Sequence, residues 1–147
     1  PKFFGYVRLT RAAWPLLKAA GGSVINIVGV GARTPSAEFT IGSSVNAGLL
    51  AFTKSMAEIG TADGVRVNAI NPGAIETDRL GAAIAAHADA AEISADSARG
   101  DMLRSMGVAR FGRPAEIGAA VAFLAGSPSA YIHGSLIDVD GGWTRGL

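Results

Sequence analysis

Residues 65–78 have the sequence VRVNAINPGAIETD, a short apolar run followed by a Pro-Gly turn, and this stretch decides the fold. A brief run rich in Val and Ile, without polar alternation, is typical of a strand covered on both faces, as in a parallel sheet. It predicts a strand from Val65 to Ile70 that stops at Pro72 and Gly73. Residues 23–30, SVINIVGV, have the same character and predict another buried strand, which we expect to be central.

Helical periodicity separates the predicted strands. Apolar residues three or four positions apart predict helices over 3–19, 41–59 and 114–125. A weaker pattern in the Ala-rich stretch 78–106 indicates one or two mobile helices, and residues 136–139 predict a last short strand. Helices and strands alternate along the chain, so the expected fold class is α/β with a doubly wound parallel sheet, Rossmann-like.

Length and composition limit the function classes. With 147 residues and 49% hydrophobic content, we expect one domain over residues 1–147. Thirteen basic residues balance 12 acidic ones, which implies neither a nucleic-acid nor a membrane partner. The chain has no Cys, and His87 and His133 lack ligand-like neighbours, so no metal site is predicted. Neither a signal peptide nor a membrane span is expected, and a cytoplasmic location is the hypothesis.

Four blocks in order carry a family resemblance: GGSVINIVG, LLAFTKSMA, VRVNAINPGAIETD, and RFGRPAEIGAAVAFLAGSPSAYIHGSLIDVDGG. The chain resembles the C-terminal portion of the short-chain dehydrogenase/reductase (SDR) family. The resemblance implies an SDR-type sheet of which only the C-terminal half is present, since the family's Gly-rich phosphate turn has no counterpart here. An incomplete record of a longer chain is favoured over a natural half-length protein. Such a sheet leaves the strand at 23–30 with one bare edge.

The resemblance also locates the family's catalytic Ser, Tyr and Lys. In the family the Tyr transfers a proton, the Lys lowers the pKa of the Tyr phenol, and the Ser polarises the substrate carbonyl. Aligning INIVG places the Ser position at Gly29, and aligning FTKSMA places the Tyr and Lys positions at Gly42 and Asn46. Both anchors agree without a gap. All three catalytic positions are therefore substituted.

A fourth substitution suggests a replacement for the missing groups. The family has an Asn three residues before the position of Gly5, and this chain has Lys2 there. Lys2 and Asn46 look like an exchange of residue types between neighbouring helices. One hypothesis makes Lys2 an electrostatic or proton-relay group, held by the Asn46 amide, with Ser43, Ser44 or a water supplying the hydroxyl. The alternative is that Lys2 is a solvated surface lysine.

The cofactor side of the family pattern is retained. In the family the turn that corresponds to residues 71–77 wraps the nicotinamide carboxamide. The resemblance therefore predicts cofactor-binding roles for four residues of the turn: Pro72, Gly73, Ile75 and Thr77. The alternative is structural, with Pro72 and Gly73 ending a strand and Thr77 or Asp78 capping the next helix. Segment 78–106 would be the substrate lid.

The leading functional hypothesis is an NAD(P)-dependent oxidoreductase acting on a carbonyl or alcohol substrate with atypical proton-transfer residues. Hydride transfer depends on positioning, and a proton donor contributes only about 10²- to 10⁴-fold, so a slow reductase is physically possible without the Tyr. The alternatives are a catalytically inactive nucleotide- or partner-binding protein and other chemistries, such as that of halohydrin dehalogenase-like relatives. Either NAD or NADP fits. The family habit of pairing helices 3–19 and 41–59 implies a homodimer or homotetramer.

Overall fold

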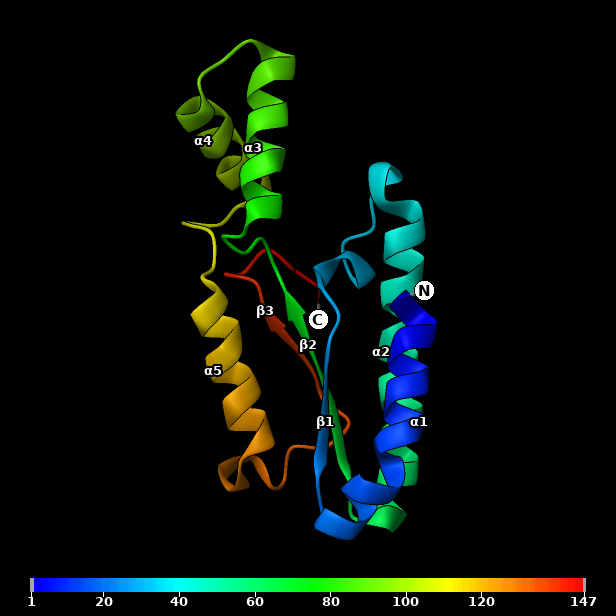
Figure 1. The fold of residues 1–147 in the computed structure, drawn as a ribbon. Coiled ribbons are helices and arrows are strands. Elements are labelled where there is room, and N and C mark those ends of the chain that lie inside the picture. Colours follow the sequence, from blue (N-terminus) through cyan, green and yellow to red (C-terminus); the bar gives the residue numbers. More distant parts are fainter. Residues whose placement is uncertain (1, 147) are drawn as a thin grey trace.

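The computed structural model describes residues 2–146, which form five α-helices, three short 3₁₀ turns and one parallel sheet (Figure 1). The elements in chain order are α1 (Lys2–Ala20), β1 (Ser23–Ile27), η1 (Val30–Ala32), η2 (Ala37–Phe39), α2 (Thr40–Asp63), β2 (Arg66–Pro72), α3 (Asp78–Ala91), α4 (Ala95–Met106), α5 (Pro114–Ala125), η3 (Ser127–Ser129) and β3 (Leu136–Val139).

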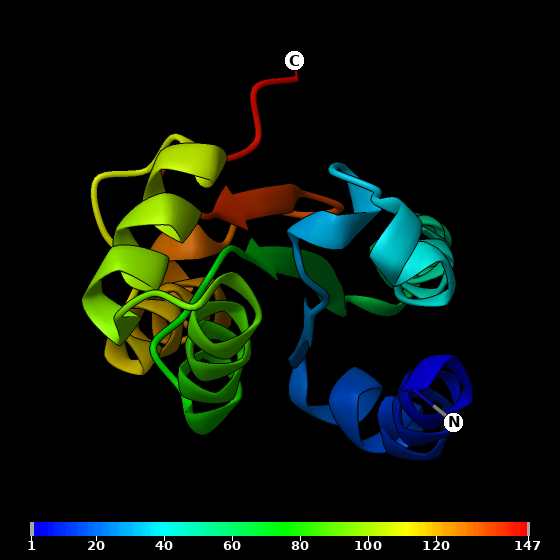
Figure 2. The same cartoon turned by 90° about the horizontal axis from the view of Figure 1, so that it is seen from above.

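The sheet lies between two helical layers, as expected of a doubly wound α/β fold. Helices α1 and α2 cover one face and α5 covers the other (Figures 1 and 2). The sheet order within residues 2–146 is β1-β2-β3, so β2 is the central strand. The prediction that strand 23–30 is central was wrong for this part of the chain: β1 pairs on one side only, and its bare edge is confirmed.

Two predicted boundaries differ from the structure for local backbone reasons. The strand predicted over 23–30 ends at Ile27, because Gly29 adopts a φ of 122° and the chain turns into η1. The helix predicted to end near residue 59 continues to Asp63. There Gly64 takes a left-handed conformation and its amide donates to the carbonyl of Gly60, an ordinary helix end. The predicted helix 114–125 and strand 136–139 match α5 and β3.

Apolar side chains of α2 and the strands make up the core. Leu49 of α2 packs with Val28 and Ala69 in one buried cluster. Ala57 packs with Val65 and Val67 in another. Burial of these side chains, at roughly 1.5–3 kcal/mol for each of the larger ones, holds α2 against β2 and so fixes the residues at its N-terminal end.

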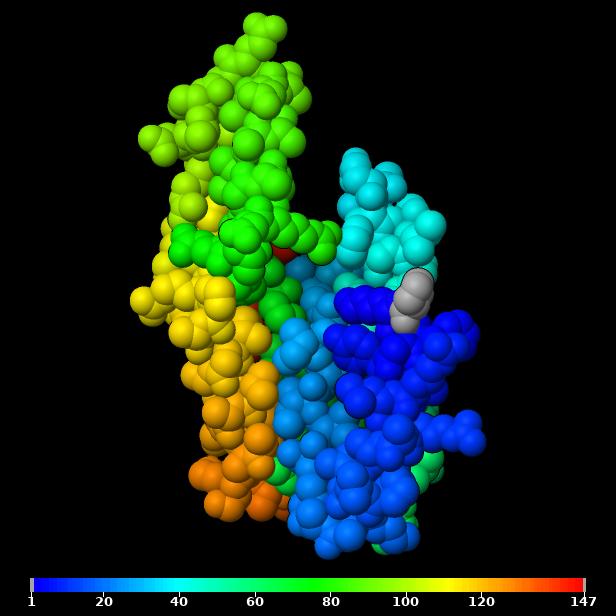
Figure 3. Space-filling model, viewed as in Figure 1, coloured from blue at the N-terminus to red at the C-terminus, as the bar shows by residue number. Residues whose placement is uncertain are grey.

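The Ala-rich segment 78–106 forms two helices, α3 and α4, that pack against each other and project past the carboxyl ends of the strands (Figure 1). Glu92 ends α3 in a left-handed conformation, and the hydroxyl of Ser94 caps α4 by accepting from the amide of Ser97. In the space-filling view, the molecule is hollowed between this helix pair and the start of α2 (Figure 3). None of the helices within residues 2–146 has the length and apolarity that a bilayer crossing requires.

Candidate functional site

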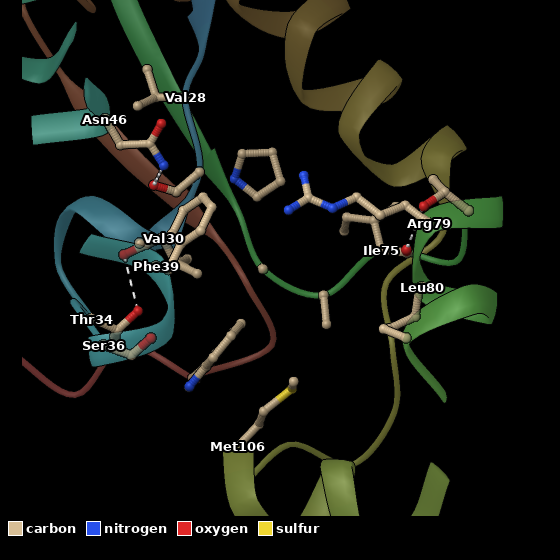
Figure 4. A pocket seen from close by; sticks show the side chains of 18 of the residues that line it. Val28, Val30, Thr34, Ser36, Phe39, Asn46, Ile75, Arg79, Leu80 and Met106 are labelled. Atoms are coloured by element: carbon tan, nitrogen blue, oxygen red, sulfur yellow. Dashed lines mark hydrogen bonds between the residues drawn. The ribbon is translucent and has the colours of Figure 1, made fainter. Parts of the chain in front are cut away.

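A cavity of about 460 Å³ opens at the carboxyl ends of β1 and β2. Open parallel sheets bind their ligands at this edge, because the loops that follow neighbouring strands diverge there. One wall consists of the loop after β1 and the first turns of α2, and the other consists of the turn after β2 and the start of α3 (Figure 4). The cavity is therefore the candidate site on position alone.

The turn over residues 72–77 contributes backbone to this cavity. It borders the cavity through all four residues assigned to the cofactor: Pro72, Gly73, Ile75 and Thr77. The amide of Gly73 donates to the carbonyl of Val139 at 3.1 Å, which ties the turn to the end of β3. A Cβ at Gly73 would lie 2.8 Å from the Cα of Asp140, so only Gly fits at this contact.

A second set of backbone hydrogen bonds fixes the far end of the turn. Ile75 forms a parallel bridge with Gly112. The amide of Glu76 donates to the Gly112 carbonyl at 2.8 Å, and the Gly112 amide donates to the Ala74 carbonyl at 2.9 Å. The RFGRPAEI block therefore has a structural role, because it contains Gly112, to which the turn is hydrogen-bonded.

An ion pair stabilises that supporting segment. The Arg110 guanidinium donates to both carboxylate oxygens of Glu116, at 2.8 and 2.6 Å, and the amide of Arg113 donates to Glu116 at 2.7 Å. The hydrogen bonds from Arg110 and then from the Arg113 amide lower the pKa of Glu116 to about 2. The carboxylate is therefore ionised throughout the neutral range.

Thr77 occupies the N-cap position of α3, yet its side chain makes no capping hydrogen bond. Its hydroxyl instead donates to the Ile75 carbonyl at 3.3 Å and borders the cavity. The Thr77 hydroxyl therefore does not cap α3, which was the structural alternative for this residue. The oxygen retains its lone pairs for a ligand in the cavity.

On the opposite wall, Gly29 stands where the resemblance predicts the family's Ser. It has no hydroxyl, and its backbone conformation is unsuited to a serine. Gly29 has a φ of 122°, a conformation that L-residues rarely adopt. A Cβ there would also lie 3.4 Å from the Asn46 Nδ2 atom. The loop backbone at Gly29 is therefore suited to glycine and not to the serine that the resemblance predicts there.

The Tyr position is filled by a neighbouring ring. The Phe39 ring lies over Gly42, where a Cβ would overlap the phenyl carbons. A Cβ at Gly31 would lie 3.0 Å from the same ring. The ring borders the cavity beside Thr34 and Ser36, as Figure 4 shows. Phe39 has no hydroxyl, so it contributes a flat apolar surface where the family has an acid.

Lys2 and Asn46 lie in direct contact. The Lys2 Nζ atom donates to Asn46 Oδ1 at 2.7 Å and to the Val28 carbonyl at 3.0 Å. The Asn46 Nδ2 atom lies 3.5 Å from the Gly29 carbonyl, to which it donates. Both side chains border the cavity. The structure thus brings together the two residues of the exchange on helices α1 and α2.

The surroundings of Lys2 weaken its hold on the proton. Burial first, and then the Arg79 guanidinium, lower the pKa of the Lys2 ammonium below its ordinary value of 10.5. Lys2 is exposed as a residue, so its ammonium is only partly desolvated, and its two carbonyl contacts oppose the lowering of the pKa. A lysine in such a position is a better acid near neutrality than a solvated one.

The two serines predicted to supply a hydroxyl, Ser43 and Ser44, do not border the cavity. Ser43 is buried on α2, its Oγ atom has no hydrogen-bond partner among residues 2–146, and it does not border the cavity. The Ser44 hydroxyl donates back to the Thr40 carbonyl at 3.0 Å and is exposed. Neither serine reaches the cavity, because the helix turns both side chains away from it. Thr34 and Ser36, in the loop before α2, are the hydroxyls that do border it.

Sequence reasoning also missed Arg79, Met106 and Trp143, whose side chains line the cavity. Arg79 carries a signal in the sequence, as the only cation between Asp78 and His87 in an Ala-rich stretch. Met106 and Trp143 reach the cavity only because α4 and the segment after β3 fold back over the strand ends. Residues 2–146 contain no group of three His, Asp or Glu side chains arranged to hold a metal ion.

Known proteins share this arrangement. A family model described as enoyl-(acyl carrier protein) reductase matches residues 2–144. The chain is 34% identical over 129 residues to the 3-oxoacyl-(acyl-carrier-protein) reductase FabG of Chlamydia pneumoniae, which covers 88% of this chain and 48% of that protein. The chain therefore spans about half the length of the curated relatives that it matches.

Two solved structures extend the comparison. YwfH, an NADPH-dependent reductase involved in bacilysin biosynthesis, matches with a TM-score of 0.91 at 29% identity, over 99% of this chain and 56% of that one. An NADPH-bound short chain oxidoreductase from Pseudomonas aeruginosa PAO1, described as containing an atypical catalytic center, matches with a TM-score of 0.85 at 32% identity, over 99% and 55%. The chain therefore belongs to the short-chain dehydrogenase/reductase family.

Proposed function

We propose that this chain is the C-terminal part of an NAD(P)-dependent oxidoreductase that interconverts a carbonyl and an alcohol on a small-molecule substrate, with the cytoplasm as its compartment. The observation that carries the proposal is that the intact turn 72–77 and the Lys2–Asn46 pair border the same cavity. The relatives support it, because they are named as reductases and two of the solved ones use NADPH.

The residues of the turn fit a nicotinamide cofactor, either NAD or NADP. The Thr77 hydroxyl does not cap α3 and belongs to a residue that borders the cavity, and Gly73 lets the turn pack closely against Asp140. When bound, the nicotinamide supplies or accepts the hydride. Pro72, Gly73, the Ile75 backbone and the Thr77 hydroxyl would hold its carboxamide end. These contacts act by orientation, which can lower a barrier by several kcal/mol without any acid or base.

Proton transfer falls to Lys2 in this proposal. Reduction of a carbonyl adds a hydride to carbon and a proton to oxygen. The Lys2 ammonium, oriented by Asn46 Oδ1 and the Val28 carbonyl, would relay that proton through a bound water. Its lowered pKa favours this role, since an acid works best when its pKa approaches the working pH. Ser43 has no part in the proposal, because it does not border the cavity.

A specific observation favours a second candidate function. Gly29 and Gly42 remove two of the family's polar groups, and Phe39 occupies the space of the second. A catalytically inactive nucleotide- or partner-binding protein would tolerate these changes without compensation. In that case, the complete protein would bind a pyridine nucleotide and turn over no substrate.

Turnover of the complete protein tests the first candidate. NADPH and NADH oxidation would be followed at the nicotinamide absorbance band with a panel of ketones and aldehydes, and nucleotide binding by calorimetry. We expect Lys2→Met to lower kcat about 100-fold, within the range for a general acid, whereas Lys18→Met on the same helix leaves kcat unchanged. Unchanged kcat in Lys2→Met would remove the role of Lys2, and absence of nucleotide binding would remove the oxidoreductase.

The proposal includes a homodimer or homotetramer. Exposed apolar side chains gather on α1 and α2: Phe4, Leu9, Leu16, Ile41 and Ile59. Groups of this kind on neighbouring helices suit an interface between two copies. Gly48 of α2 is not free for such a contact, because a Cβ there would lie 3.3 Å from the Phe3 ring of the same chain. Light scattering of the complete protein and of Ile41→Asp, which should dissociate the pair, checks this expectation.

A further inference from the structure

Arg79 is a cation without a partner inside the candidate site. It is the second residue of α3, and its side chain extends from that wall into the cavity (Figure 4). Among residues 2–146 it makes no ion pair and no side-chain hydrogen bond. The other arginines of the helix pair are used: Arg99 pairs with Glu76 at 2.6 Å, and Arg104 pairs with Asp101.

The cavity has a positive lining. Lys2 and Arg79 border it, whereas no Asp or Glu among the described residues does. Glu76, which lies between two residues that border the cavity, is paired with Arg99, and Asp138 is paired with Arg33. The guanidinium of Arg79 is close enough to Lys2 to lower the pKa of its ammonium. An anion in the cavity would relieve this repulsion and supply the missing partner of Arg79.

The neighbours of Arg79 point to the substrate as the source of that anion. Lys2 is held at the β1 side by Asn46, whereas Arg79 lies beside the apolar side chains that α3 and α4 present to the cavity: Leu80, Ala83 and Met106. A guanidinium has a planar, forked set of donors that matches a carboxylate with two parallel hydrogen bonds. A chain of carbon atoms against Leu80 and Ala83 would place such a carboxylate at Arg79.

We propose that Arg79 is a specificity-determining residue that binds the carboxylate of an oxo-acid or hydroxy-acid substrate. The inference rests on the proposed oxidoreductase and names its substrate class. Lys2 serves the reacting oxygen and Arg79 serves the distal carboxylate, so the two cations hold opposite ends of one small molecule. The apolar side chains between them select a hydrocarbon spacer.

Pairs of an oxo acid and its methyl ester test the carboxylate charge separately from the rest of the substrate. Straight-chain 2-, 3- and 4-oxo acids, each with its methyl ester, would be tested on the complete protein by calorimetry with NADP⁺ and by turnover with NADPH. The wild type should prefer at least one acid over its ester. Arg79→Gln should weaken binding and kcat/KM for that acid by about 10- to 100-fold, the range for a lost charge-assisted hydrogen-bond pair, and change the ester less than threefold.

Two further variants sharpen the test. Arg79→Lys should recover part of the loss, because it keeps the charge but not the fork. Arg104→Gln, which removes an exposed cation of α4 outside the cavity, should behave as wild type. An equal loss for acid and ester together with a raised KM for NADPH would assign Arg79 to a cofactor phosphate and overturn the proposal. So would a wild type that prefers no acid.

The outcomes also distinguish this inference from the proposed function. Arg79-dependent binding of an acid without any turnover would leave the carboxylate site standing and remove the oxidoreductase. Turnover of neutral esters with no preference for acids would do the reverse.

Discussion

The two walls of the cavity differ in what constrains them. The backbone of the turn over residues 72–77 is locked by hydrogen bonds to β3 and to Gly112. The wall formed by the loop after β1 and the start of α2 presents side chains, and three of its positions differ from the family pattern. Gly29, Gly42 and Asn46 stand where the family resemblance predicts the Ser, Tyr and Lys.

The difference shows which features of the site are held by the fold. A change at Gly73 or Gly112 meets other parts of the chain, because a Cβ would lie 2.8 Å from Asp140 in the first case and 2.6 Å from Ile75 in the second. A change at a side-chain position alters chemistry while the helix around it persists. The turn over residues 72–77 is therefore constrained by contacts with other backbone segments, whereas the opposite wall is constrained at Gly42 by a side chain, Phe39.

The largest expected effect is on the turn over residues 72–77. Gly73→Val places branched carbons against the Asp140 backbone, and we expect it to lower the free energy of unfolding by about 3 kcal/mol. Urea unfolding of the complete protein measures this change. Gly81→Ala, on α3 with open space around it, is the control and should stabilise by about 0.5–1 kcal/mol. Equal stability of Gly73→Val and wild type would show that the turn is not constrained as described.

On the opposite wall, restoring the family acid should fail on its own. Gly42→Tyr drives the new side chain into the Phe39 ring, and we expect a loss of about 1–3 kcal/mol in stability and no gain in kcat. Phe39→Ala/Gly42→Tyr removes the collision and should recover most of the stability. The double variant should also exceed Phe39→Ala in turnover. A single Gly42→Tyr variant with wild-type stability would contradict the overlap.

A smaller effect concerns the coupling between Lys2 and Asn46. Lys2→Met and Asn46→Ala should each weaken nucleotide binding by about threefold to tenfold, and the double variant should be no weaker than either one. This corresponds to a coupling free energy of about 1 kcal/mol. Calorimetry on the four proteins gives the value. Strictly additive losses would mean that the two side chains act independently and that the 2.7 Å contact carries no energy.

The smallest expected effect lies in the support of the turn and depends on pH. The folded-state pKa of Glu116 is about 2, below its usual value of 4.5, so its contribution to stability is complete above pH 4.5 and is lost as the pH falls toward 2. Glu116→Gln should therefore be less stable than wild type at pH 7, and the two should converge near pH 2. Arg110→Gln should give the same pattern, because it removes the other half of the pair. A constant separation between pH 7 and pH 2, in urea midpoints, would exclude this ion pair as the cause.

The sequence predicted the layers and the turn after β2 well, because both depend on local patterns. Alternating helices and short apolar strands identified the α/β fold, and the block 65–78 identified the turn. The order of strands was harder: β2 is central because both neighbours pair with it, and periodicity does not encode pairing. Helix 41–59 was predicted too short, since Thr61 and Asp63 look like a loop by composition but continue α2.

Only part of the candidate site could be predicted from the sequence. Lys2 and Asn46 followed from counting positions against the family, and the structure places them in contact. Ser43 was chosen for its closeness in sequence to Gly42, but a helix turns by about 100° per residue, which takes its side chain into the core. Arg79 and Trp143 enter the cavity from segments far from Gly42 along the chain, so only the tertiary fold brings them there.

The backbone at Gly29 limits how the family's residues could be restored. Because its φ is 122°, a serine at position 29 would place a β-carbon on a conformation suited to glycine. The loop would have to change with it, and Phe39 would have to leave position 42 clear. A serine at position 29 and a tyrosine at position 42 therefore require coordinated changes in the loop and at Phe39, not two independent substitutions.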